Sequence, residues 1–368
     1  MKRILFITNS LGFAGAEKML TFVANSLSKR GHACCIVNLD VIGGYINEQK
    51  QQVSEQVVVH TVEQPPENMS RHKFRIQKLY QYTKEFKPDV LIGFTRFPSC
   101  YARIVGRMCR IPSIMSERGD PARTTPNTLK AKLILGVVNG SAGGVFQTEG
   151  AMVTYGKGLR KRGTVIPNPI FVQGQVPEVP FDKREKTVVT VGRLDNEQKR
   201  YDVMIRAFKI FSQSHPEYTL KLYGRGVDED KIRNWAQEQG ISDKVRLMGL
   251  TSKPMECIAS DGMFLITSDF EGISNSLLEA MAVGLPCVST DHTPGGARLL
   301  IQDHENGLLA PIGDSEALAK AMGEFADNPE LARKCGENAK DVLVRFAPER
   351  MIDMWENYIC KICGEEAE

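Results

Sequence analysis

Two glutamates in one short stretch have the types and the spacing of a ligand-binding site. Glu271 follows an apolar run, and Glu279 lies eight residues later, about two helical turns along the chain. Between them, Gly272 permits a sharp turn, and Ser274 or Asn275 can cap the helix that follows. The free backbone amides at such a helix start bind anions. The stretch therefore predicts a carboxylate at a strand end, amides that hold phosphate, and a second carboxylate on the same side.

A nucleotide-diphosphate sugar requires these groups: acceptors for the sugar hydroxyls, a cradle for the diphosphate and an acceptor for the ribose hydroxyls. A second pair of residues supports this interpretation. Arg193 follows a strand that ends at Val191, and Lys199 comes six residues later. Two cations beside a strand end can neutralise a departing diphosphate. The alternative is an ordinary capped helix with two solvated glutamates.

No motif for a metal or a dinucleotide accompanies these residues. The sequence has no G-x-G-x-x-G after its first strand, no Walker motif and no H-E-x-x-H among its six histidines. Its D-x-D, Asp228-Glu229-Asp230, falls where a helix should begin. We interpret it as acidic charge at a helix N-terminus rather than as a metal site, and we expect neither a metal nor a cofactor.

Short apolar strands alternate with helical patterns along the whole chain, stop at Val172–Phe181 and then restart. This predicts an α/β fold of two Rossmann-like, doubly wound domains, at residues 1–173 and 182–348. Because ligands bind beyond the carboxyl ends of parallel strands, we expect the site in a cleft between the domains. The predicted strands are Ile4–Thr8, Cys34–Leu39, Val57–Val62, Asp89–Phe94, Ser113–Ser116, Gly144–Gln147, Thr164–Ile166, Thr187–Val191, Thr219–Tyr223, Val245–Leu247, Met263–Thr267 and Cys287–Thr290.

The composition indicates a cytoplasmic globular protein. No apolar run approaches the roughly 18 residues of a membrane-spanning helix, and nine scattered cysteines fit reduced thiols. Residues 1–175 contain 24 Lys and Arg and 11 Asp and Glu, a net charge of +13, whereas residues 176–368 contain 23 and 33, a net charge of −10. The first half is therefore expected to meet an anion, although scatter in solvated surface charge would give the same count.

Four segments, in chain order, resemble glycosyltransferase family 4. They are Phe13-Ala14-Gly15-Ala16-Glu17, similar to a G-G-A-E loop with Ala14 in place of the first glycine; Val191-Gly192-Arg193 with Lys199, similar to the family's diphosphate-binding pair; Glu271 and Glu279 followed by Ala280-Met281-Ala282, similar to its E-x7-E signature; and Asn306-Gly307-Leu308-Leu309, similar to its N-G-L-L segment. The resemblance implies a GT-B fold whose last helix, about 349–363, crosses back to the first domain. It also implies a retaining, metal-independent hexosyl transfer.

The resemblance further implies roles for individual residues. Arg193 and Lys199 stabilise the departing nucleotide diphosphate, Glu271 orients the sugar, and Glu279 accepts from the ribose. The family's histidine near the donor sugar is absent, since that place reads Ser116-Glu117-Arg118-Gly119-Asp120-Pro121, and either Arg118 or Glu117 replaces it. The expected donor-binding positions are Gly15, Gly192, Gly224, Gly226, Met248, Gly249, Gly272, Ile273, Ser274, Asn275, Ser276, Leu277 and Glu279.

The favoured donor is a UDP-sugar, and the expected acceptor is anionic and lipid-linked, in surface-polysaccharide synthesis. Basic stripes in the first half predict peripheral contact with the anionic inner face of the cell membrane, with aromatic side chains entering the interface; no nucleic acid is expected. Four alternatives stay open: a GDP-sugar transferase, a UDP-sugar 2-epimerase of the same fold, a non-catalytic binding module, and a fully soluble transferase whose acceptor is a small anion. The residues behind the membrane prediction are Arg71, Lys73, Arg75, Lys78, Arg103, Arg107, Arg110, Lys157, Arg160, Lys161, Arg162, Phe74, Phe97 and Tyr101.

Overall fold

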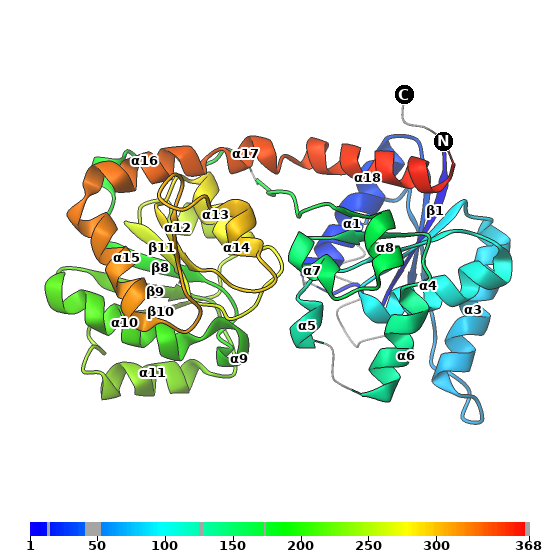
Figure 1. The fold of residues 1–368 in the computed structure, drawn as a ribbon, viewed down its shortest axis with the longest axis horizontal. Helices are drawn as coiled ribbons and strands as arrows, with labels where there is room; N and C mark the ends of the chain where they lie inside the picture. The colour runs from blue at the N-terminus through cyan, green and yellow to red at the C-terminus, as the bar shows by residue number, and fades with distance from the viewer. Residues whose placement is uncertain (13–14, 41–52, 125–127, 173, 365–368) are drawn as a thin grey trace. The chain divides into compact units, whose positions relative to one another are not determined.

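The computed structural model describes all residues except 13–14, 41–52, 125–127, 173 and 365–368. The chain forms two compact units. The first domain comprises Met1–Asn168 and Glu349–Glu368, and the second comprises Pro169–Pro348. Each has a parallel sheet with helices on both faces (Figure 1). The prediction of two Rossmann-like domains is confirmed.

The first domain is built on seven parallel strands in the order β3-β2-β1-β4-β5-β6-β7. Its central strands are buried along almost their whole length, because helices cover both faces and leave no polar side to alternate with an apolar one. The strands are β1 (Arg3–Thr8), β2 (Ala33–Asn38), β3 (Val58–Thr61), β4 (Val90–Phe94), β5 (Ser113–Ser116), β6 (Gly143–Phe146) and β7 (Gly163–Val165). The helices are α1 (Gly15–Lys29), α3 (Arg71–Phe86), α4 (Arg96–Cys109), α5 (Pro121–Thr124), α6 (Leu129–Val138), α7 (Glu149–Val153) and α8 (Lys157–Arg162).

The last helix, α18 (Pro348–Ile362), packs on the first domain beside α1 (Figure 1). Trp355 is fully buried and stacks on Phe94, with ring centroids 5.7 Å apart. The hydroxyl of Tyr358 accepts a hydrogen bond from the amide of Gly144 at 2.8 Å. These contacts confirm the predicted return of the last helix to the first domain.

The second domain has six parallel strands in the order β10-β9-β8-β11-β12-β13. One strand was not predicted: Leu308–Ala310 (β13) pairs with β12, and three residues are too few to show a periodicity. The strands are β8 (Thr187–Val191), β9 (Thr219–Tyr223), β10 (Val245–Gly249), β11 (Met263–Ile266), β12 (Cys287–Thr290) and β13. The helices are η1 (Phe181–Lys183, a 3-10 turn), α9 (Asn196–Lys199), α10 (Tyr201–Ser214), α11 (Glu229–Glu238), α12 (Pro254–Ile258), α13 (Asn275–Ala282), α14 (Gly296–Leu300), α15 (Ser315–Asp327), α16 (Pro329–Ala339) and α17 (Val342–Arg345).

Each sheet has one point where the strand order reverses, between β1 and β4 in the first domain and between β8 and β11 in the second. Connections leave such a point toward opposite faces, so a crevice opens at the carboxyl ends of the two strands. In the second domain these two ends carry Gly192–Lys199 and Glu271. In the first they carry the start of α1 and the start of α4.

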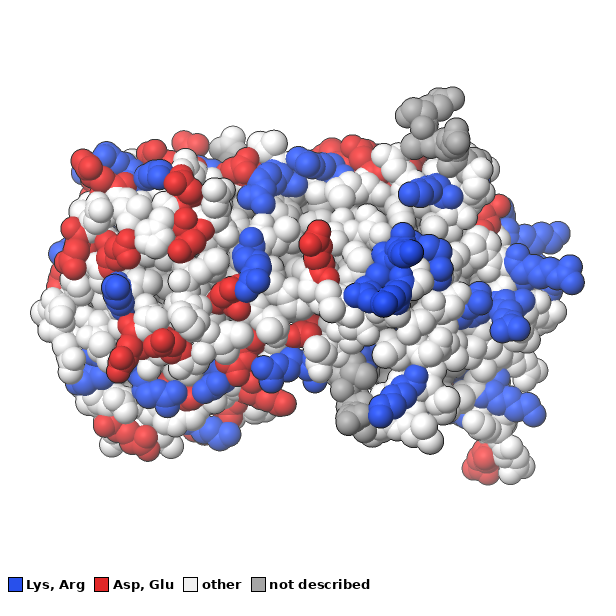
Figure 2. Space-filling view, in the orientation of Figure 1, with Lys and Arg blue, Asp and Glu red and all other residues white. Residues whose placement is uncertain are grey.

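Charge is distributed unevenly on the surface. In the face shown in Figure 2, Lys and Arg gather over α8 of the first domain, where Lys157, Arg160, Lys161 and Arg162 lie, whereas acidic and basic side chains mix on the second domain. Among the described residues, no helix has the length and apolar character that crossing a bilayer would require.

Candidate functional site

Lys199 and Glu271 meet at the strand-order reversal of the second sheet. Lys199 is the last residue of α9, which follows β8, and Glu271 lies in the loop after β11. The ammonium group of Lys199 donates to Oε1 of Glu271, and the hydroxyl of Ser268 donates to the same oxygen at 2.6 Å. Only 16% of the Lys199 side chain and 8% of the Glu271 side chain are exposed. The structure thus brings together two predicted site residues that are 72 positions apart.

The surroundings keep this carboxylate ionised. Burial alone would raise the pKa of Glu271, but the charges of Lys199 and His292 and the hydrogen bonds from Lys199 and Ser268 lower it to about 2. At neutral pH the pair is therefore a buried ammonium–carboxylate contact. It presents a fixed acceptor and a fixed cation at the edge of the sheet.

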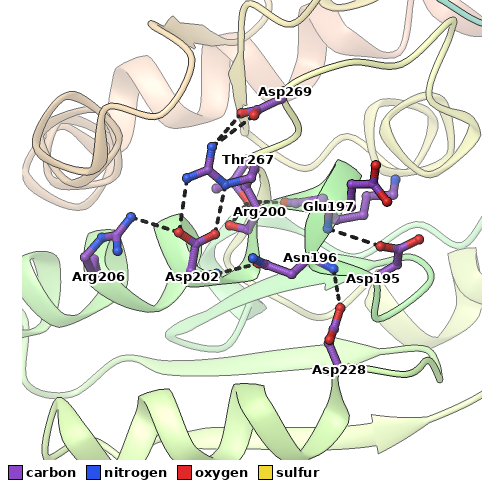
Figure 3. A network of polar contacts seen from close by, with 10 residues as sticks. Asp195, Asn196, Glu197, Arg200, Asp202, Arg206, Asp228, Thr267 and Asp269 are labelled. Carbon is purple, nitrogen blue, oxygen red and sulfur yellow. Dashed lines mark hydrogen bonds and ion pairs between the residues drawn. The ribbon is translucent and has the colours of Figure 1, made fainter. Parts of the chain in front are cut away.

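A network of polar contacts holds the two loops in register (Figure 3). Arg200, which directly follows Lys199, donates to both carboxylate oxygens of Asp269 at 2.9 and 3.2 Å, and it also binds Asp202. The hydroxyl of Thr267 donates to the carbonyl of Lys199 at 2.8 Å. The loop that carries Lys199 is thus tied to the loop that carries Glu271 by contacts that lie close to the ion pair in the sequence.

Arg200 and Asp269 were missed by sequence reasoning. Both lie next to residues that were singled out, so their types were visible. Their pairing spans 69 positions, and only the tertiary structure creates it. Arg200 also has a φ of 52°, an uncommon value for a residue with a Cβ, at the corner between α9 and α10.

Helix α13 begins shortly after Glu271, at the helix start that the sequence predicts to bind an anion. Ser274 occupies the N-cap position, yet its side chain makes no capping hydrogen bond and contacts Ser276 Oγ at 3.1 Å instead. Ser274 is thus the N-cap residue by position, as predicted, but the first-turn amides have no side-chain acceptor from it. Leu277 is fully buried, so only its backbone can reach a ligand. Glu279 lies one turn further along and is half-buried.

Arg193 differs from Lys199 in its surroundings. Its side chain is 71% exposed, and it donates to Gln198 Oε1 at 3.1 Å. Its backbone carbonyl accepts from the hydroxyl of Tyr201 at 3.0 Å, which anchors the loop. The guanidinium group is thus available to a ligand, while the loop that carries it is fixed.

Gly224 and Gly226 are required by backbone packing. A Cβ on Gly224 would lie 1.8 Å from the carbonyl oxygen of Gly192, and a Cβ on Gly226 would lie 2.2 Å from that of Leu194. The two glycines therefore let the β9 loop pack directly on the loop that carries Arg193, which accounts for them without a nucleobase. Gly249 accepts from the amide of Gly224 at 2.8 Å, and nearby Met248 is 43% exposed.

The acidic triplet at the start of α11 has structural partners. Asp228 accepts from the amide of Asn196 at 2.7 Å and pairs with Lys231 at 2.7 Å, and α11 begins at Glu229 as predicted. These contacts support α9, the helix that ends at Lys199. Within the ranges that the structure describes, no group of three His, Cys, Asp or Glu residues is placed to hold a metal ion.

Glu117 and Arg118 both lie at the end of β5 in the first domain. Arg118 donates to Ser116 Oγ at 2.8 Å, and its guanidinium carbon lies 5.3 Å from the ring centroid of Trp355. Burial lowers the pKa of Arg118 to about 9, although Glu117 opposes this shift, so the group remains charged at neutral pH. The carboxylate of Glu117 accepts from the hydroxyl of Tyr155 and lies 3.6 Å from Arg96.

The amino-terminal loop and the basic stripes are only partly as expected. Gly15 is the first residue of α1, whereas Phe13 and Ala14 of the predicted loop lie outside the described residues. Arg71 and Arg75 both pair with the single carboxylate of Asp40, and Arg75 is buried, so one of the four positive charges of this stripe is compensated within the domain.

The three aromatic residues expected at a membrane interface differ in their burial. Tyr101 is 4% exposed and bonded to His72, and Phe74 packs against the core; only Phe97, at 42%, is well exposed. The expectation of an interfacial role is therefore wrong for Tyr101, whose ring is buried against the sheet instead. Phe74 is only partly buried, and for it the expectation stays a prediction.

Comparison with known proteins agrees with this geometry. Residues 173–342 match the family described as glycosyl transferases group 1. An uncharacterised glycosyltransferase of Haemophilus influenzae is 25% identical over 98% of this chain and 100% of its own length. The N-acetylgalactosamine-N,N'-diacetylbacillosaminyl-diphospho-undecaprenol 4-alpha-N-acetylgalactosaminyltransferase of Campylobacter jejuni is 26% identical over 92% of this chain and 94% of its own length.

Among solved structures, HepE of Anabaena in complex with UDP superimposes with a TM-score of 0.83. It covers 98% of this chain and 100% of its own chain at 17% identity. This likeness shows the fold, in which the two Rossmann-like domains have the GT-B arrangement of elements.

Proposed function

We infer that this chain is a retaining glycosyltransferase that takes its sugar from a nucleotide-diphosphate donor, with UDP favoured. The match of residues 173–342 to the group 1 glycosyl transferases supports this proposal. The observation that carries the proposal is the buried Lys199–Glu271 pair at the strand-order reversal of the second sheet, beside the helix start at Ser274. The HepE structure, which contains UDP, supports the choice of nucleotide.

The proposed roles follow from position and exposure. Arg193 and Lys199 stabilise the charge that grows on the leaving diphosphate as the bond from the anomeric carbon to its oxygen breaks. Lys199 has three donor hydrogens, so it can keep Glu271 and still contact a phosphate. Glu271 orients the sugar together with the backbone of Gly272 and Ile273. The acceptor hydroxyl attacks from the face that the diphosphate leaves, and its proton passes to the departing phosphate oxygen, so the configuration is retained.

The remaining donor contacts are proposed on the same basis. The amides at the start of α13, from Ser274 to Leu277, hold the phosphates. Glu279 accepts from the ribose hydroxyls, and Gly15 allows the amino-terminal loop to approach the diphosphate. Gly249 and the exposed Met248 border the place proposed for the base. No metal is required in this scheme, because two cations and a helix start supply the positive charge.

The proposed acceptor is anionic and lipid-linked, in the synthesis of a surface glycan. The net positive charge of the first half and the basic cluster of α8 support it, as does the diphospho-undecaprenol in the name of the Campylobacter relative. Sedimentation with anionic and neutral liposomes at low and high salt tests the membrane contact. Protein that stays in the supernatant with anionic vesicles at low salt would exclude it.

Slow hydrolysis of the donor tests the reaction without a known acceptor. UDP-α-linked sugars are first screened by thermal shift, where a ligand at 100 times its dissociation constant adds about 2.7 kcal/mol. We then expect release of UDP with the α-anomer appearing first by NMR. A β-anomer formed first would contradict retention.

Two other results would point to the alternatives. Deuterium incorporated from heavy water at C2 of the sugar, without any acceptor, would indicate the epimerase. Binding of the donor without turnover, in the presence of a range of glycan acceptors, would indicate a binding module. The Lys199→Met variant serves as the control for background hydrolysis.

A further inference from the structure

The first domain contains a pocket of its own. It has a volume of about 410 Å³ and lies at the strand-order reversal between β1 and β4. Ala16, near the start of α1, and Thr95 to Phe97, at the start of α4, form its floor. The pocket therefore occupies the position in the first sheet that Lys199 and Glu271 occupy in the second.

The polar wall of this pocket is positively charged. Arg96, Arg118 and Lys130 line it together with a single carboxylate, Glu117. Within the described parts of the chain, the buried Nη2 of Arg118 and the buried Nε of Arg96 have no hydrogen-bond partner. Buried guanidinium nitrogens without a partner are costly, and an anion in the pocket would lower that cost.

The backbone adds donors to the same wall. Helix α4 begins at Arg96, and its N-cap residue Thr95 has a φ of 69° and makes no side-chain cap. The amides of the first turn thus have no acceptor within the helix, and the dipole of a helix of 14 residues favours an anion there. These amides and the guanidinium group of Arg96 come from one short segment.

Apolar side chains also line the pocket, and exposed apolar side chains follow on helix α6. Phe97, Ala131 and Ile134 line the pocket. Beyond them Leu129 and Leu133 of α6 are 75% and 63% exposed. Exposed leucines one helical turn apart, beside a pocket with a cationic end, match a ligand that is anionic at one end and aliphatic at the other.

We propose that this pocket binds a phosphate group carried on an aliphatic chain, with the phosphate at Arg96 and the start of α4 and the chain along Phe97 and α6. This inference rests on the proposed function, since such a ligand is the lipid-phosphate end of the acceptor. Beyond the proposed function, the inference assigns a binding site for that end of the acceptor and names the residues that form it. Its two anchoring residues, Arg96 and Phe97, are not among the residues proposed to bind the donor.

Titration with three soluble probes tests the site: farnesyl monophosphate, farnesol and inorganic phosphate. Farnesyl monophosphate should bind more than about tenfold tighter than either fragment, because only it contacts both the polar and the apolar lining. Arg96→Gln should weaken its binding by about tenfold or more, the loss of one charge-assisted hydrogen bond. Phe97→Ser should weaken farnesyl monophosphate without changing the response to inorganic phosphate.

Lys84→Gln is the control, since Lys84 is exposed in the last turn of α3 in the same domain and does not line the pocket. It should leave binding unchanged. Inorganic phosphate that binds as tightly as farnesyl monophosphate would overturn the proposal, as would an Arg96→Gln variant that binds like Lys84→Gln. Circular dichroism and urea unfolding of the same samples show that each variant is folded, and UDP-sugar binding shows that the donor site is intact. A protein that binds UDP-sugars but not farnesyl monophosphate would refute this site alone, whereas one that binds no nucleotide sugar would refute the proposed function.

Discussion

Replacing Lys199 by methionine separates the structural cost of the ion pair from its role in the reaction. Methionine keeps most of the volume of the lysine stem but removes the ammonium group. The carboxylate of Glu271 would then be buried with only Ser268 and His292 nearby to stabilise its charge. Breaking a buried pair by removing one partner costs about 3–5 kcal/mol of unfolding free energy, because the remaining charge is left uncompensated.

The pKa of Glu271 gives a figure for the net effect of its surroundings, in which burial opposes Lys199, His292 and Ser268. Its ordinary value of 4.5 is lowered to about 2 in the folded protein, and this difference corresponds to about 3 kcal/mol. Since the folded-state pKa is lowered, this contribution is fully present above about pH 4.5. It is lost as the pH falls through about 2. In Lys199→Met the pKa of Glu271 should rise, so the variant should lose less stability than the parent when the solution is acidified.

The matched variant is the double substitution Lys199→Met with Glu271→Gln, which removes both charges. It should recover most of the lost stability, because no ion remains buried, yet it should stay at least about 100-fold below the parent in kcat, because the cation beside the leaving group is still missing. Urea unfolding followed by circular dichroism and steady-state kinetics give the two readings. If the double variant is as unstable as Lys199→Met, the uncompensated carboxylate is not the cause of the loss. If it regains activity, Lys199 does not act on the leaving group.

Three further predictions concern the surroundings of this pair, and a fourth concerns metal. Arg193→Ala should lower kcat about 100-fold without shifting the urea midpoint, since the side chain is 71% exposed; turnover within a few-fold of the parent in kinetic assays would contradict its role. Asp269→Asn should lower kcat about tenfold by loosening Arg200, whereas Arg206→Ala, at the exposed end of the same network, should not; equal effects in the two would argue against positioning. Gly224→Ala should cost at least about 2 kcal/mol by urea unfolding, because its Cβ would lie 1.8 Å from the carbonyl oxygen of Gly192, while Gly240→Ala, also at positive φ but with open space, should cost less. Activity should persist in excess EDTA, and a loss that Mn²⁺ or Mg²⁺ restores would refute metal independence.

Local features of the sequence were sufficient to predict the fold and the types of residue at the proposed donor site. Buried parallel strands must be continuous apolar runs, so their places can be read from composition alone. Gly192 and Gly272 were predicted to follow strands, because tight turns at strand ends favour glycine. Arg193 comes directly after the first of these glycines. The start of α11 at Glu229 followed from the acidic residues that favour a helix N-terminus.

Long-range contacts decided which of these residues meet and what each side chain faces. Lys199 and Glu271 are joined across 72 positions, and Arg200 and Asp269 across 69, by the order of strands in a sheet that no local pattern encodes. The same applies to Arg75 and Tyr101, which look like surface residues in the sequence but are buried by neighbours from other segments. A side chain's burial and charge partner depend on elements distant in the chain. The sequence by itself therefore determined the chemistry available to this protein, and only the tertiary structure decided where that chemistry is concentrated.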